Sequence, residues 1–101
     1  MKRRIIVGDI HGCFKTLRSL LEDKIKITKE DKLFFVGDFI DRGPSSREVL
    51  DYLIDLKWRG FKVLAIRGNH EDMLLQAVED ESYLHAWFNN GAEYTLKSFD
   101  V

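Results

Sequence analysis

Three short apolar runs punctuate this sequence, and each of them ends at or just before a glycine that opens a cluster of polar residues. The runs cover residues 4–7, 32–36 and 61–66, and their β-branched and aromatic content favours strands. Between them, apolar residues recur at helical spacing over residues 14–21 and 49–56. Strands that alternate with helices favour parallel pairing with right-handed crossovers. The sequence therefore predicts an α/β fold with a mostly parallel sheet and flanking helices.

Helical spacing continues after the third run, over residues 73–78, 83–88 and 92–99. Four aromatic residues in the helical segments are predicted to lie in the core or to cover the sheet: Trp58, Trp87, Phe88 and Tyr94. No linker, repeat or low-complexity tract divides the chain. We therefore expect residues 1–101 to form a single domain.

The composition excludes several classes of protein. The 16 basic and 17 acidic residues give a formal charge of −1, so no basic footprint for nucleic acid is present. No apolar run approaches the roughly 18 residues that span a membrane. The single cysteine cannot form an intramolecular disulfide, which makes a reducing cytoplasm the expected location.

The polar clusters lie directly after the three predicted strands, at residues 8–12, 37–43 and 68–71. Loops that follow parallel strands emerge at one edge of the sheet, where α/β proteins bind ligands. The sequence thus directs seven polar residues towards one cleft: Asp9, His11, Asp38, Asp41, Arg42, Asn69 and His70.

These residue types suit a metal site beside a phosphate site. Asp9 and His11 are two residues apart and can face one cation, which Asp38 could bridge to a second cation with Asn69 as a further oxygen ligand. Mixed oxygen and imidazole donors suit Mn²⁺, Fe²⁺ or Zn²⁺. Arg42 carries the planar guanidinium that pairs with two phosphate oxygens.

Each residue taken alone also has a purely structural interpretation. Asp9 could cap the helix that starts near Cys13, and Asn69 could be a turn residue. Glu71 is interpreted as a residue that complements a helix N-terminus. Three such clusters in order, each at a strand end, favour the functional interpretation.

The three clusters read G-D-x-H-G, G-D-x-x-D-R-G and G-N-H-E, and these signatures resemble those of the PPP family of metallophosphoesterases. That family includes serine/threonine protein phosphatases and symmetrical diadenosine-tetraphosphate hydrolases. The resemblance runs from Ile5 to Glu71. Asn90-Gly91 and Thr95-Leu96 are similar to the N-G-G…T-L stretch of the bacterial branch, with Ala92 in place of the second glycine.

The resemblance implies a phosphoester hydrolase with two divalent metal ions, in which a hydroxide shared by the metals attacks phosphorus. Mn²⁺ is the expected metal, ahead of Fe²⁺ and Zn²⁺. Asp9, His11 and Asp38 would hold the first metal, and Asp38 with Asn69 part of the second. It also implies that this chain supplies the N-terminal half of an αββα sandwich.

The same resemblance assigns the remaining site residues. Arg42 and Asn69 would bind the phosphoryl oxygens, and His70 would act as general acid towards the leaving oxygen. Asp41 would hydrogen-bond His70 and orient its ring. The substrate would be a phosphoprotein or a dinucleoside polyphosphate.

The chain also departs from the family pattern. Members are usually more than twice as long and bring two further histidines and an arginine from their C-terminal half, whereas the third histidine here, His85, is at no ligand position. We therefore expect an incomplete second metal site and one exposed apolar sheet face. A truncated phosphoesterase domain is the first explanation, and a homo-oligomer that pairs through this face is the second. The alternatives for function are a dinucleoside tetraphosphate hydrolase, a catalytically inactive fragment that binds metal or a partner, and a phosphodiester nuclease.

Overall fold

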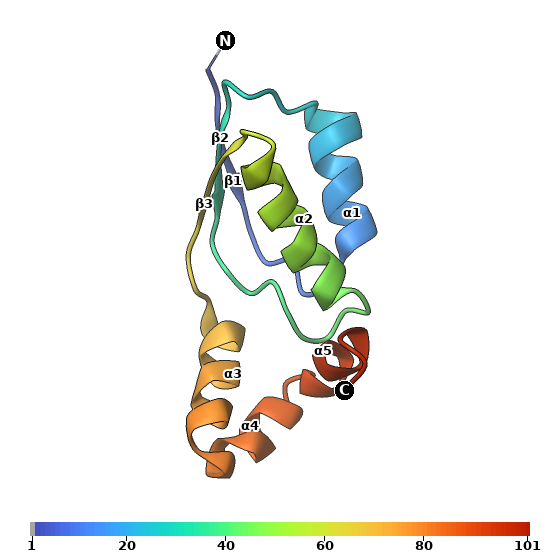
Figure 1. Ribbon diagram of the computed structural model, residues 1–101, viewed down its shortest axis with the longest axis vertical. Coiled ribbons are helices and arrows are strands. Elements are labelled where there is room, and N and C mark those ends of the chain that lie inside the picture. Colours follow the sequence, from blue (N-terminus) through green and yellow to red (C-terminus); the bar gives the residue numbers. More distant parts are fainter. Residues whose placement is uncertain (1) are drawn as a thin grey trace.

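The computed structural model describes residues 2–101 and has a three-stranded parallel sheet in the order β1-β2-β3 (Figure 1). The strands are β1 (Arg4–Val7), β2 (Lys32–Phe35) and β3 (Lys62–Ala65). Their register aligns Ile6 with Phe34 and Phe34 with Leu64. The predicted α/β fold with a parallel sheet is confirmed.

Helices occupy two places around this sheet (Figure 1). The first helical layer packs on one face of the sheet, and the remaining helices extend beyond the carboxyl ends of the strands. In chain order the helices are α1 (Phe14–Arg18), which continues as the π-helical η1 (Ser19–Ile25), then α2 (Ser46–Trp58), α3 (Asn69–Glu79), the 3₁₀ turn η2 (Glu81–Tyr83), α4 (Leu84–Phe88) and α5 (Ala92–Ser98). The resulting molecule is elongated, with extents of 48 × 20 × 20 Å.

The main core lies between the sheet and the layer formed by α1, η1 and α2. Its fully buried side chains include Leu21, Leu33, Phe35, Val49 and Leu56. They come from the inward side of the strands and from one stripe of each helix, as the period of two in strands and 3.6 in helices requires. Burial of these side chains fixes the ends of the strands, from which the polar loops start.

A smaller core joins α3, α4 and α5 around Trp87, which is 3 % exposed. The prediction that Trp58, Phe88 and Tyr94 also lie in the core or cover the sheet is wrong, since Trp58 is 85 % exposed and Phe88 and Tyr94 are exposed as well. Trp58 lies two residues after the buried Leu56, about 200° around α2, so it points away from the core stripe.

In the described part of the chain, residues 2–101, no helix covers the second face of the sheet (Figure 1). Ile6, Leu64 and Ile66 are 73 %, 62 % and 58 % exposed there, as the family resemblance led us to expect. The helices within residues 2–101 include none with the length and hydropathy of a membrane span.

An ion pair ties the start of β1 to the loop before β2. Asp31 has no exposed surface and accepts hydrogen bonds from Arg3 Nε at 3.0 Å, Arg3 Nη2 at 2.8 Å and the Thr28 N–H at 2.8 Å. The hydrogen bonds from the Arg3 guanidinium, followed by that from Thr28, lower the pKa of Asp31 to about 2. This pair anchors the edge strand at the end of the sheet opposite the polar loops.

Candidate active site

The loops that follow β1 and β2 are joined by main-chain hydrogen bonds. The N–H groups of Ile10 and His11 both donate to the Asp38 carbonyl, at 3.1 and 2.9 Å, and the Gly12 N–H donates to the Phe39 carbonyl at 2.8 Å. Because the parallel strands end side by side, these two loops leave the sheet at the same edge. Their polar side chains are therefore brought together by backbone structure.

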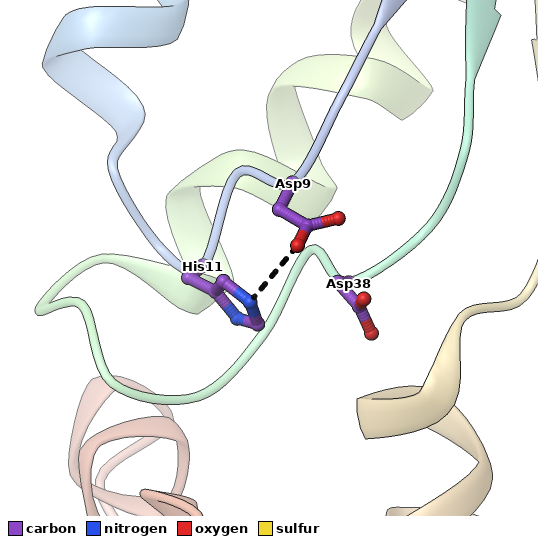
Figure 2. Close-up of side chains that lie close together, drawn as sticks. All are labelled: Asp9, His11 and Asp38. Atoms are coloured by element: carbon purple, nitrogen blue, oxygen red, sulfur yellow. Dashed lines mark ion pairs between the residues drawn. The ribbon is translucent and has the colours of Figure 1, made fainter.

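Asp9, His11 and Asp38 form a cluster in which one potential ligand atom from each residue lies within 4.8 Å of the others (Figure 2). His11 Nε2 is 3.8 Å from Asp9 Oδ2. His11 Nδ1 is 2.9 Å from the Ile40 carbonyl oxygen, which can only accept, so Nδ1 carries the proton and Nε2 keeps its lone pair. A histidine held in this way is prepared to bind a cation. Two carboxylates and one oriented imidazole fit a divalent metal ion.

Glu71 holds the backbone on which Asp38 is carried. Its Oε1 accepts the N–H groups of Asp38 at 2.6 Å and Gly68 at 2.8 Å, and its Oε2 accepts those of Phe39 at 2.8 Å and Ile40 at 3.4 Å. Asp38 has a left-handed backbone with φ of 55°, which a non-glycine residue adopts only when its surroundings impose it. One carboxylate thus links the loops after β2 and β3.

A side chain at position 68 would obstruct this arrangement, because a Cβ there would lie 2.5 Å from Asp38 N and 2.6 Å from Asp38 Oδ1. The glycine lets α3 begin close to Asp38, whose Oδ1 accepts the His70 N–H at 2.9 Å. The first turn of α3 is therefore fixed against the cluster of potential metal ligands.

His70 and Asp41 form a buried pair beside this cluster. His70 Nδ1 lies 2.8 Å from Asp41 Oδ2, and the two side chains are 7 % and 0 % exposed. The His70 ring also packs edge-on against His11, with 4.5 Å between ring centroids. The carboxylate of Asp41 accepts two more hydrogen bonds, from Trp87 Nε1 at 2.8 Å and from Thr95 Oγ1 at 2.6 Å.

Arg42 and Asn69 lie on the exposed side of the site. The Arg42 guanidinium Nη2 is 3.5 Å from Asn90 Oδ1, and the Arg42 backbone N–H donates to the Gly91 carbonyl at 3.3 Å. Asn69 is the first residue of α3, and no other residue within 2–101 hydrogen-bonds its side chain. His85 lies on α4, where its ring is 3.3 Å from the Asn89 amide nitrogen.

Comparison with known proteins decides the family. The family described as calcineurin-like phosphoesterase matches residues 2–100. This chain belongs to that family. The family resemblance inferred from the three signatures is therefore confirmed.

Two relatives in this family illustrate its range. Serine/threonine-protein phosphatase 1 of Salmonella typhimurium is 42 % identical over 90 residues, which cover 88 % of this chain and 38 % of the relative. The symmetrical bis(5′-nucleosyl)-tetraphosphatase of Buchnera aphidicola is 44 % identical over 69 residues, 68 % of this chain and 24 % of the relative. This chain thus spans well under half the length of these relatives.

Solved structures show the same fold. A crystal structure of a protein assigned as a diadenosine tetraphosphatase aligns with a TM-score of 0.67 and 34 % identity, over 83 % of this chain and 36 % of that chain. A Saccharomyces cerevisiae serine/threonine phosphatase aligns with a TM-score of 0.58 and 29 % identity, over 69 % of this chain and 25 % of that chain. The metallophosphoesterase fold is thereby shown for this part of the family domain.

Sequence reasoning assigned no role in the candidate site to three residues that support it: Glu71, Trp87 and Thr95. Glu71 does support the N-terminus of α3, but it also binds three N–H groups of the loop after β2. Its place in the G-N-H-E signature was the available signal. Trp87 was correctly expected to be buried, but nothing in its spacing indicated a hydrogen bond to Asp41.

Ala92 shows why the second glycine of the N-G-G stretch is dispensable in this chain. Gly91 has a left-handed φ of 96°, whereas Ala92 is the first residue of α5 and is fully buried. A helical residue needs no glycine, and the methyl group packs in the smaller core. Only the first position of the pair carries the conformational requirement.

Proposed function

We propose that residues 1–101 are the N-terminal, metal-binding part of a phosphoester hydrolase domain of the serine/threonine phosphatase type. The observation that carries the proposal is the cluster of Asp9, His11 and Asp38 next to the buried His70–Asp41 pair. Divalent metal ions bound there would activate water and neutralise charge for attack on phosphorus. The family membership of the chain supports the same reaction class.

The proposed roles follow the donor atoms. Asp9, His11 and Asp38 hold the first metal, since their ligand atoms are already close and His11 presents Nε2. Asp38 and Asn69 contribute oxygen ligands to the second metal. Because that site would then have no imidazole from residues 2–101, we expect it to be incomplete in this chain. Mn²⁺ is the favoured ion, with Fe²⁺ and Zn²⁺ as the other ions that suit these donors.

The proposed acid and the phosphate ligands are the remaining polar residues of the site. With both ring nitrogens protonated, His70 donates Nδ1–H to Asp41 and delivers the proton on Nε2 to the leaving oxygen. Arg42 and Asn69 bind the phosphoryl oxygens as negative charge develops on them. Asp41 orients the ring of His70.

A phosphoprotein is the first proposed substrate, and a dinucleoside tetraphosphate is the second, because relatives named for each activity match this chain. The near-neutral charge supports a substrate other than nucleic acid. The single, exposed Cys13 is compatible with the reducing cytoplasm. The exposed sheet face around Ile6 and Leu64 is the surface through which a second copy could bind.

Mn²⁺ binding provides the direct test. The purified chain is titrated with Mn²⁺, with free Mn²⁺ followed by electron paramagnetic resonance, and compared with Asp38→Asn and with Asp51→Asn. Asp51 is an exposed α2 carboxylate outside the site, so its variant is the matched control. We expect Asp38→Asn to weaken binding about 10-fold or more. Equal binding by wild type and Asp38→Asn would refute the proposed metal site.

Hydrolysis is then measured with Mn²⁺ on p-nitrophenyl phosphate, a phosphothreonine peptide and diadenosine tetraphosphate. Turnover of the phosphopeptide supports the first substrate class, and turnover of the dinucleotide alone supports the second. Metal binding without turnover of any ester would favour the alternative of an inactive metal- or partner-binding module.

A further inference from the structure

The carboxylate of Asp41 is buried and receives three side-chain hydrogen bonds, of which only the one from His70 was expected. Oδ2 accepts from His70 Nδ1 and Trp87 Nε1, both at 2.8 Å, and Oδ1 accepts from Thr95 Oγ1 at 2.6 Å. Asp41 is 0 % exposed, Trp87 3 % and Thr95 4 %. The two additional donors come from α4 and α5, more than forty positions along the chain.

The donors around Asp41 determine which atom carries the proton between Asp41 and His70. An indole N–H can only donate, so Oδ2 of Asp41 must accept from Trp87. Thr95 Oγ1 donates its proton to Oδ1 at 2.6 Å and accepts the Asp41 N–H at 2.7 Å, which Ser46 Oγ also accepts at 3.2 Å. Both carboxylate oxygens therefore act as acceptors. The proton between Asp41 and His70 then belongs to His70 Nδ1.

The same helices hold the strained backbone of this loop. Asp41 and Arg42 both have left-handed φ angles, 72° and 69°. Thr95 Oγ1 accepts the backbone N–H of Asp41, and the Gly91 carbonyl accepts the backbone N–H of Arg42 at 3.3 Å. Non-glycine residues adopt this conformation when neighbouring groups over-determine it. The α4–α5 segment thus fixes both the backbone and the carboxylate of Asp41.

We propose that Trp87 and Thr95 are positioning residues for the general acid: they hold the Asp41 carboxylate in the orientation that keeps one ring proton on His70 Nδ1, so that the second ring proton, on Nε2, is the one transferred to the leaving oxygen. This inference rests on the proposed function for the role of His70, but the hydrogen-bond arrangement is testable without it. If Thr95 only filled space, Val would replace it without effect on His70, since Val has nearly the shape of Thr but no hydroxyl. Phe in place of Trp87 removes the N–H donor together with part of the ring, so the Thr95 variants are the stricter comparison.

The first test observes the hydrogen bonds themselves by NMR, on ¹⁵N-labelled chain. We expect protected signals for Trp87 Nε1–H and His70 Nδ1–H, and a displaced Trp87 signal in Asp41→Asn. Trp58 is 85 % exposed and provides an internal reference indole. In Trp87→Phe and Thr95→Val we expect the His70 Nδ1–H signal to be lost to solvent exchange, whereas Thr95→Ser and Trp58→Phe retain it. An unchanged His70 signal in both Trp87→Phe and Thr95→Val overturns the proposal. If Trp87→Phe fails to fold, the Thr95→Val and Thr95→Ser pair decides.

The second test compares leaving groups. Protonation matters little for p-nitrophenolate and much for an alkoxide, so a misplaced general acid slows hydrolysis of an alkyl phosphate more than that of p-nitrophenyl phosphate. We expect the ratio of the two kcat/KM values to change by about 10-fold in Trp87→Phe and Thr95→Val, and not in Trp58→Phe. A wild-type chain that hydrolyses neither ester would favour the alternative of an inactive metal- or partner-binding module, while the NMR result still decides the positioning. Equal slowing of both esters, with an unchanged His70 signal, would leave Trp87 and Thr95 as core residues only.

Discussion

Replacement of Glu71 by glutamine removes the charge that joins the loops after β2 and β3 while keeping the size of the side chain. Four backbone N–H groups donate to the two carboxylate oxygens at 2.6–3.4 Å. Glutamine has one acceptor oxygen, and its NH₂ group would face two of those donors. Hydrogen bonds to a charged group contribute about 1.5–3 kcal/mol each. With two of them lost at a partly buried site, we expect Glu71→Gln to lower the free energy of unfolding by about 3 kcal/mol.

Urea and thermal unfolding followed by circular dichroism measure this loss. For a chain of this size, about 3 kcal/mol corresponds to a fall in Tm of more than about 10 °C. Glu79→Gln is the matched control, because Glu79 is an exposed residue at the other end of α3 and its replacement should change stability by less than about 0.5 kcal/mol. A loss for Glu71→Gln as small as that of the control would show that the carboxylate does not hold the loops.

Three further perturbations test separate parts of the structure. The pKa of Asp31 is lowered from 3.8 to about 2, so its ion pair with Arg3 stabilises the fold at pH values above about 3.8 and loses that effect as the pH falls towards 2. The urea midpoint of the wild type should therefore fall more steeply than that of Asp31→Asn between about pH 4 and 2. Parallel curves for the two proteins would contradict this. Gly91→Ala places a Cβ 2.7 Å from Arg42 N at a φ of 96° and should lower the free energy of unfolding in urea by about 1–3 kcal/mol. An unchanged free energy of unfolding would show that the turn accommodates the methyl group. Leu64→Lys interrupts the exposed sheet face and should abolish concentration-dependent association in analytical ultracentrifugation; a wild-type chain that is monomeric at all concentrations would exclude the proposed pairing.

Local sequence was sufficient for the strands and for the first part of the site. The predicted strand at residues 4–7 coincides with β1, and the predictions for β2 and β3 differ from the structure by one residue at their ends. Side-chain alternation and parallel order then bring Asp9, His11 and Asp38 to one edge, because loops after parallel strands leave the sheet together. These properties follow from short-range patterns and one topological rule.

The support of the site did not follow from such patterns. Glu71, Trp87 and Thr95 bond to residues 33, 46 and 54 positions away, across loops whose left-handed turns at Asp38 and Asp41 no periodicity predicts. Trp87 and Trp58 are the same residue type and both lie on helices. Trp87 is nevertheless buried and donates to the Asp41 carboxylate, whereas Trp58 is exposed to solvent. The difference comes from how α4 and α5 pack back onto the loop after β2, since a hydrogen bond between distant residues exists only once the whole chain has brought donor and acceptor to within about 3 Å.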